Sequence, residues 1–143
     1  MTGAASPVNL HAGCVALDGR GVLILGPSGS GKSALALHLM ALGCELVSDD
    51  RTDLVARDGR LLASAPAATA GLIEARGVGI LRAAARDRAE VVLAVDLGTA
   101  ETERLPPRRQ ICVCDVTIPL LHGLSAPHFP AMIVQLLRGG LAD

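Results

Sequence analysis

Apolar residues along this chain gather in short runs that are separated by glycine, proline and polar residues. Runs of four to eight such residues, rich in β-branched side chains and bounded by turn residues, are typical of buried strands. The dipeptide Asp58-Gly59 between two runs is a strong hairpin signal. The pattern predicts strands at residues 14–18, 21–25, 45–48, 52–56, 61–63, 90–97 and 110–120.

One segment has helical spacing instead. Residues 32–42 are rich in helix formers. Leu35, Leu39 and Leu42 lie on one face of the predicted helix, and Gly43 is a natural C-terminal stop. The predicted strand at 21–25, the loop after it and this helix together form a strand–loop–helix unit.

The remaining segments decide the fold class. Residues 72–81 hold an acid between apolar residues, 98–109 form a polar connector with prolines, and 131–137 predict a terminal helix. Strands dominate, and a hairpin follows the first helix. The chain therefore predicts one α/β domain over residues 1–143, a P-loop domain with a mixed, strand-rich sheet.

The loop after strand 21–25 matches the phosphate-binding pattern G-x-x-x-x-G-K-[ST] in full. Its residues are Gly26, Pro27, Ser28, Gly29, Ser30, Gly31, Lys32 and Ser33. The glycines let backbone N–H groups turn toward phosphate oxygens, and a helix N-terminus adds partial positive charge. Lys32 can reach the β and γ phosphates, and the Ser33 hydroxyl can join the shell of Mg²⁺. The loop predicts a bound nucleotide with Mg²⁺.

Catalysis needs acids as well as a phosphate loop. Asp49 and Asp50 follow the short strand 45–48, where active sites of α/β domains gather. Adjacent residues at a strand end can diverge, so one carboxylate can face the metal and the other the nucleophile. Glu74 is either an outward strand position or a second carboxylate on Mg²⁺, and its spacing does not separate the two.

Composition and charge exclude other classes. The 143 residues have a net charge of −1, one Phe, and no Trp or Tyr, which argues against a nucleic-acid surface. Apolar runs are too short to span a membrane, and residues 1–10 lack a secretory signal. The four cysteines have no zinc spacing, so we expect buried thiols in a reducing cytoplasm; they are Cys14, Cys44, Cys112 and Cys114. The pair 112 and 114 is expected on one face of a strand.

Several segments together resemble the catalytic domain of HPr kinase/phosphorylase. They are Leu10-His11-Ala12, residues 21–24, the phosphate loop, residues 43–50 and residues 72–80. The resemblance extends over most of the chain from His11 onward. The paired Asp at a fixed distance from the loop and the Glu-x-Arg-Gly-x-Gly segment make it more specific than the loop alone.

The resemblance implies a fold similar to phosphoenolpyruvate carboxykinase and a kinase that uses ATP and Mg²⁺ to phosphorylate a serine of HPr, the phosphocarrier of the phosphotransferase system. It implies metal binding by Ser33 and Glu74 and phosphate binding by Lys32. One of Asp49 and Asp50 would take the serine proton; we favour Asp50, with Asp49 on the metal side. His11 matches a histidine near the active site. The family's catalytic arginine would be Arg104, and its assembly a hexamer.

The chain departs from the family pattern in three places. Family members carry a further N-terminal domain, whereas this chain resembles the short form of alphaproteobacteria. Ala34 stands where Glu is frequent. Residues 124–130 lack the Gly-Arg of the segment linked to dephosphorylation, so the resemblance supports the kinase half more than the phosphorylase half. Two alternatives stay open: a P-loop kinase of small molecules, and a nucleotide-sensing module without turnover.

Overall fold

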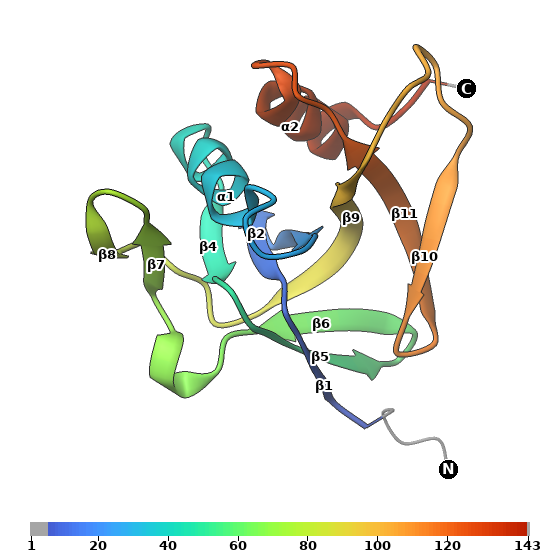
Figure 1. Ribbon diagram of the computed structural model, residues 1–143. Helices are drawn as coiled ribbons and strands as arrows, with labels where there is room; N and C mark the ends of the chain where they lie inside the picture. Colours follow the sequence, from blue (N-terminus) through green and yellow to red (C-terminus); the bar gives the residue numbers. More distant parts are fainter. Residues whose placement is uncertain (1–5, 143) are drawn as a thin grey trace.

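The structure is a computed structural model that describes residues 6–142. Nine strands form one sheet and two form a separate hairpin (Figure 1). The strands are β1 (Val8–Leu10), β2 (Gly13–Leu17), β3 (Arg20–Leu25), β4 (Glu45–Ser48), β5 (Thr52–Arg57), β6 (Arg60–Ser64), β7 (Leu72–Ala75), β8 (Gly79–Arg82), β9 (Ala89–Ala100), β10 (Arg109–Val113) and β11 (Val116–Gly123). The helices are α1 (Lys32–Ala41), α2 (Phe129–Gly139) and a 3-10 turn at Ala67–Thr69.

Strand β9 is the centre of the large sheet. The strand order is β1-β5-β6-β9-β3-β2-β4, and β9 also pairs with β11, which pairs with β10. β9 runs parallel to β3 and β11 and antiparallel to β6. The sheet is therefore mixed, and the predicted fold class is confirmed.

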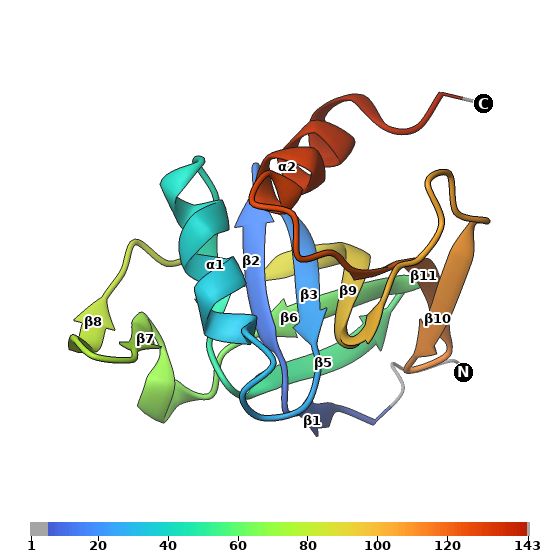
Figure 2. The same ribbon diagram turned by 45° about the horizontal axis from the view of Figure 1, so that its top comes forward.

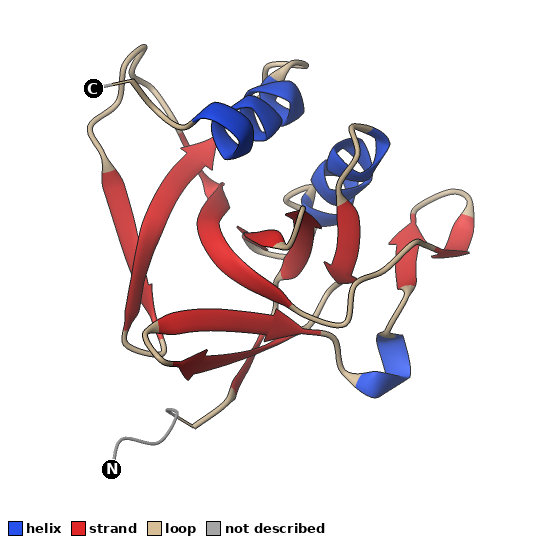
Figure 3. Ribbon diagram, turned by 180° about the vertical axis from the view of Figure 1, so that it is seen from behind, coloured by secondary structure: helices blue, strands red, loops and turns tan. Residues whose placement is uncertain are grey.

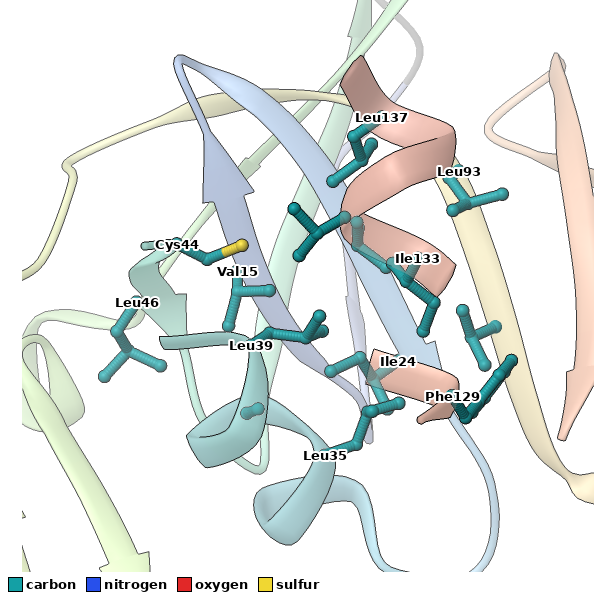
Figure 4. Close-up of a cluster of buried hydrophobic side chains, with 14 of the residues drawn as sticks. Val15, Ile24, Leu35, Leu39, Cys44, Leu46, Leu93, Phe129, Ile133 and Leu137 are labelled. Atoms are coloured by element: carbon teal, nitrogen blue, oxygen red, sulfur yellow. The ribbon is translucent and has the colours of Figure 1, made fainter. Parts of the chain in front are cut away.

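Alternating side chains of the central strands supply two cores. Val22 and Ile24 of β3 face the helices, whereas Leu23 between them faces the other side. Figure 4 shows the first core, in which Leu39 of α1 and Ile133 of α2 meet the sheet. The second core is enclosed by strands, because β5, β6, β10 and β11 fold over the opposite face (Figure 3). One face thus carries helices and the other is closed by the sheet itself.

Helix α1 ends within one residue of its predicted end, before Gly43. Two of the three leucines that were expected on one face of the helix are buried. Gly43 has φ +111°, and the amides of Gly43 and Cys44 bond the carbonyls of Met40 and Leu39 at 3.1 and 3.0 Å. Leu35 and Leu39 are buried, but Leu42 is 43% exposed. Leu42 does not share the buried face, because α1 ends at Ala41, one residue before the predicted end, and Leu42 is its C-cap.

The predicted strand at 110–120 is two strands. Cys114 and Asp115 have φ of +51° and +63°, which makes a two-residue hairpin turn between β10 and β11. Such turns usually contain glycine, which is absent here. Cys112 is exposed and Cys114 half-buried, in the turn, so the expectation of two buried thiols on one strand face is wrong. Cys14 and Cys44 are buried as expected.

Other boundaries shift by small amounts. β9 continues to Ala100, so the polar connector shortens, and residues 72–82 form the β7–β8 hairpin. The expectation about residues 1–10 falls partly on residues 1–5, which lie outside the described residues. Among residues 6–142, neither helix has the length and apolar character needed to cross a bilayer.

Candidate active site

The phosphate loop lies at the carboxyl end of β3, beside the end of the parallel strand β9 (Figure 2). Ligands of α/β sheets bind at such ends. Gly26 has φ +147°, and a Cβ there would lie 2.5 Å from Ser30 Oγ, so the turn requires glycine. Helix α1 begins at Lys32 after Gly31, and no side chain caps its first N–H groups. This helix N-terminus is therefore open to an anion.

Lys32 is folded back onto the loop. Its Nζ donates hydrogen bonds to the carbonyl oxygens of Gly26, at 2.7 Å, and Pro27, at 3.1 Å. Only 9% of Lys32 is exposed. A phosphate oxygen is a stronger acceptor for an ammonium group than a neutral carbonyl. Lys32 is thus held in the loop and can exchange these bonds for phosphate.

Several polar groups of the loop have no partner within residues 6–142. The backbone N–H groups of Ser28, Gly29 and Gly31 make no hydrogen bond. Ser30 Oγ is buried and also lacks a partner. Buried polar groups are nearly always paired in folded proteins. The loop therefore fits a phosphate chain, whose oxygens accept from N–H and O–H groups.

Asp49 links three elements around the loop. Its Oδ1 accepts a hydrogen bond from Ser33 Oγ at 2.8 Å, and its Oδ2 accepts one from the backbone N–H of Glu74 at 3.0 Å. Asp49 is 8% exposed. The carboxylate thus holds the start of α1, the end of β4 and strand β7 together.

Asp50 points away from its neighbour. Its φ of +68° is unusual for a residue with a side chain, and it turns the carboxylate toward His11. Asp50 Oδ1 lies 2.9 Å from His11 Nε2. The Asp50 side chain is 70% exposed and that of His11 37%. The two carboxylates therefore diverge, with Asp49 buried and Asp50 exposed.

Two hydroxyl groups hold this turn in place. Thr52 Oγ1 donates to the carbonyl of Ala12 at 2.8 Å, and Ser48 Oγ donates to the carbonyl of Arg51. Both residues are buried. The positive φ at Asp50 is thus fixed by its surroundings, as backbone strain at functional sites usually is.

The loop and the acids line one cavity of about 950 Å³. The predicted site residues that it brings together are His11, Ser28, Gly29, Gly31, Lys32, Ser33, Asp49, Asp50 and Glu74. Sequence analysis gave no role to other lining residues, which include Leu37, Thr69, Arg76, Val78 and Ile80. Three of these residues lie in the Gly-rich segment 76–80. Its glycines were the feature of the sequence that could have indicated a functional turn.

The donor set suits Mg²⁺. Ser33 Oγ, the Asp49 carboxylate and the Glu74 carboxylate are oxygen ligands, which Mg²⁺ prefers. In residues 6–142 no three His, Cys, Asp or Glu side chains converge as a metal cluster. Mg²⁺ in phosphoryl-transfer sites uses one or two carboxylates, water and the phosphates, so this sparse set fits it.

Arg104 is the one predicted catalytic residue placed apart from the others. It lies in the connector between β9 and β10 and does not line the cavity. Figure 1 shows that connector on the opposite side of α1 from β7 and β8. Its catalytic role stays a prediction.

Residues 3–121 match the family model described as HPr Serine kinase C-terminal domain. The chain belongs to this family. Curated proteins named HPr kinase/phosphorylase from Clostridium botulinum (strain Eklund 17B / Type B) and Clostridium tetani are 44% identical over 77 residues, which is 54% of this chain. The matched part is 25% of each relative, so the chain corresponds to about a quarter of their length.

A solved structure has the same fold over nearly the whole chain. It is described as the Hpr(Ser) kinase/phosphatase from Coxiella burnetii. The TM-score is 0.77 and the identity 28%, over 92% of this chain and 94% of that chain. The family predicted from the sequence is therefore confirmed.

Proposed function

We propose that this chain is an ATP- and Mg²⁺-dependent serine kinase that acts on an HPr-type phosphocarrier protein and so regulates a phosphotransferase system. The divergence of the paired acids beside the phosphate loop carries the proposal. Asp49 is buried against Ser33, whereas Asp50 is exposed beside His11. A site with one acid for the metal and one for an incoming hydroxyl suits transfer to a second protein.

The proposed roles follow from these positions. Lys32 and the free loop amides hold the phosphates and offset the charge that develops on the transferred group. Ser33, Asp49 and Glu74 would hold Mg²⁺, which would supply positive charge to offset that of the phosphates. Lys32 and Ser33 begin α1, whereas Asp49 follows β4 and Glu74 lies in β7. These side chains are therefore positioned before the substrate arrives.

Asp50 is the proposed general base. As the serine oxygen bonds to the γ-phosphorus and the bond to the ADP oxygen breaks, the hydroxyl proton passes to the Asp50 carboxylate. His11, 2.9 Å away, orients that carboxylate. Asp49 is less accessible to an incoming hydroxyl, because it is 8% exposed and is held by Ser33 and the Glu74 amide.

The setting of the proposed kinase follows from the family. We propose that residues 1–143 form one catalytic domain, that it assembles as a hexamer, and that it works in the cytoplasm without nucleic-acid or membrane partners. Arg104 keeps its proposed catalytic role. Net charge of −1 and the near absence of aromatic residues support the exclusion of nucleic acid.

The test is phosphoserine formation on a phosphocarrier protein incubated with the chain, ATP and Mg²⁺. Asp50→Asn should lower the transfer rate by about 100-fold or more, the usual contribution of a general base. It should leave nucleotide binding unchanged, because Asp50 makes no contact with the loop.

Asp58→Asn is the matched control. Asp58 has φ +54° in an exposed hairpin turn, and asparagine is equally suited to that turn. If Asp50→Asn transferred phosphate at the wild-type rate, the assignment of Asp50 as the base would be disproved. Transfer to small molecules only, or tight ATP binding without any transfer, would disprove the proposed function.

A further inference from the structure

The β7–β8 hairpin stands apart from the main sheet (Figure 2). Its residues Arg76, Val78 and Ile80 line the cavity. Its base is firm: Ile73 is 1% exposed, and Leu81 packs against the first core. Its two strands pair with each other and not with the main sheet, and the Glu74 amide donates to Asp49 at 3.0 Å. The hairpin is therefore anchored at its base, whereas its tip, residues 76–80, is not paired with the main sheet.

The tip exposes apolar side chains where turn chemistry disfavours them. Val78 is 78% exposed and Ile80 63%, and both line the cavity. Val78 stands between Gly77, with φ +90°, and Gly79, with φ +140°. Turns favour Asn, Asp and Gly, so a β-branched apolar residue departs from the local rule. Such departures gather at functional sites.

A free cation adjoins this apolar pair. Arg76 is exposed and makes no hydrogen bond or ion pair within residues 6–142. The hairpin register places Glu74 opposite Ile80, so both side chains share one face. Adjacent exposed apolar side chains can mark a protein-binding site, and arginine is enriched in protein interfaces. The tip combines both next to the proposed metal ligand.

We propose that Arg76, Val78 and Ile80 form the docking surface for the acceptor protein, a hypothesis that rests on the proposed function. The surface takes an apolar side chain next to the phosphorylated serine and an acidic side chain opposite Arg76. With the acceptor held at the hairpin tip, its serine reaches Asp50 across the same open cavity.

Exposure decides against the other occupant, the base of the nucleotide. Ligand pockets bury about 70–90% of a small molecule. With 78% of Val78 exposed, few neighbouring residues surround it, which suits a protein surface better than an enclosed base. An apolar side chain at an open edge is instead covered when a protein surface lands on it.

The first experiment combines Val78→Ser with Ile80→Thr in the whole chain and measures steady-state transfer to a phosphocarrier protein. KM for the acceptor should rise about tenfold or more, the loss expected from removing two interface anchors. KM for ATP should stay within about twofold, since no nucleotide contact changes. Leu141→Thr is the matched control, because Leu141 is 61% exposed but lies outside the cavity.

The second experiment tests the charge. Arg76→Glu should raise KM for the acceptor, and one acceptor variant with Lys in place of an acid near the serine should restore it. Arg60→Glu, at the exposed start of β6 beside another hairpin turn, should change neither KM for the acceptor nor KM for ATP.

A rise in KM for ATP instead of KM for the acceptor would assign the tip to the nucleotide and overturn the docking surface. Unchanged constants in an active enzyme would overturn it too, while leaving the kinase assignment intact. A wild-type protein that transfers nothing would overturn both proposals.

Discussion

At the scale of single residues, the proposed site depends on one unusual backbone angle. Asp49 and Asp50 are adjacent, yet they contact Ser33 and His11 on different elements. A left-handed conformation at a residue with a side chain costs about 1–2 kcal/mol. The φ of +68° at Asp50 is stabilised by hydroxyl hydrogen bonds on both sides of the turn. This local strain separates the two carboxylates.

A second residue-scale feature fixes the connector after β9. The Glu101 carboxylate accepts hydrogen bonds from Arg109 Nε and Nη2 at 3.2 and 3.1 Å. The amides of Thr102 and Glu103 donate to it as well. The Arg109 guanidinium, followed by these amides, lowers the pKa of Glu101 against the opposing effect of desolvation. Glu101, just after β9, and Arg109, at the start of β10, thus hold the two ends of the connector together.

Replacing Glu101 by Gln should lower the urea midpoint of unfolding at pH 7. Because the folded pKa lies below its ordinary value of about 4.3, the carboxylate stabilises the fold above that pH. That stabilisation is lost as pH falls through the lowered pKa. The midpoints of wild type and variant should therefore converge in acid.

Glu103→Gln is the control, since Glu103 lies 3.7 Å from Arg109 with a side chain that is 58% exposed. It should have little effect at any pH. A difference in urea midpoint between wild type and Glu101→Gln that stays constant from pH 7 to 3 would contradict stabilisation by the Glu101 carboxylate.

At this scale the sequence predicted which residue types meet but not how they bond. The phosphate loop, the two aspartates and His11 do line one cavity. The hydrogen bond from the Glu74 backbone to Asp49 depends on where β7 lies, which no local pattern encodes. The docking tip was missed because exposed apolar residues look like a strand in a sequence.

At the scale of elements, α1 is both a core helix and the base of the loop. Leu39 is fully buried in the first core, whereas Leu42 just after the helix is 43% exposed. Local spacing placed both on one face. Where the helix stops is set by Gly43 and the following strand, so only the structure separates the two leucines.

Leu39→Ala should reduce the free energy of unfolding by about 2–5 kcal/mol, the range for a buried leucine. Leu42→Ala, the same substitution at an exposed site, should change it by less than about 1 kcal/mol. Denaturant titration of both variants measures the contrast. Equal losses would mean that Leu42 is buried in solution.

Element boundaries were predicted best where a turn residue marked them. Asp58-Gly59 and Gly43 gave a hairpin and a helix end that the structure contains. The β10–β11 turn was missed because Cys114 and Asp115 take left-handed angles without glycine. β1 was also missed, since its three residues, of which Val8 and Asn9 are exposed, form a strand only through pairing with β5.

At the scale of the whole molecule, the loop groups without partners predict ligand-linked stability. Mg²⁺ with a non-hydrolysable ATP analogue at 100 times its Kd should stabilise the fold by about 2.7 kcal/mol. For a chain of this length the Tm should rise by roughly 5–10 °C. Thermal unfolding with and without the analogue measures the shift.

Lys32→Met is the comparison variant, because Lys32 is the only loop side chain with a positive charge. It should lose most of the ligand-dependent shift while keeping a cooperative transition. An undiminished shift in Lys32→Met would place the analogue elsewhere.

The position of β9 has a consequence for how the chain acquires its structure. Residues of β3 pair with residues of β9 that lie about 70 positions later in the chain. Strand β9 also pairs with β6 and β11. Pairings between distant segments form slowly, because a long loop must close first. During synthesis the first 88 residues emerge with β3 lacking its parallel neighbour. We therefore expect the phosphate loop, which follows β3, to acquire its final shape only after β9 has been synthesised.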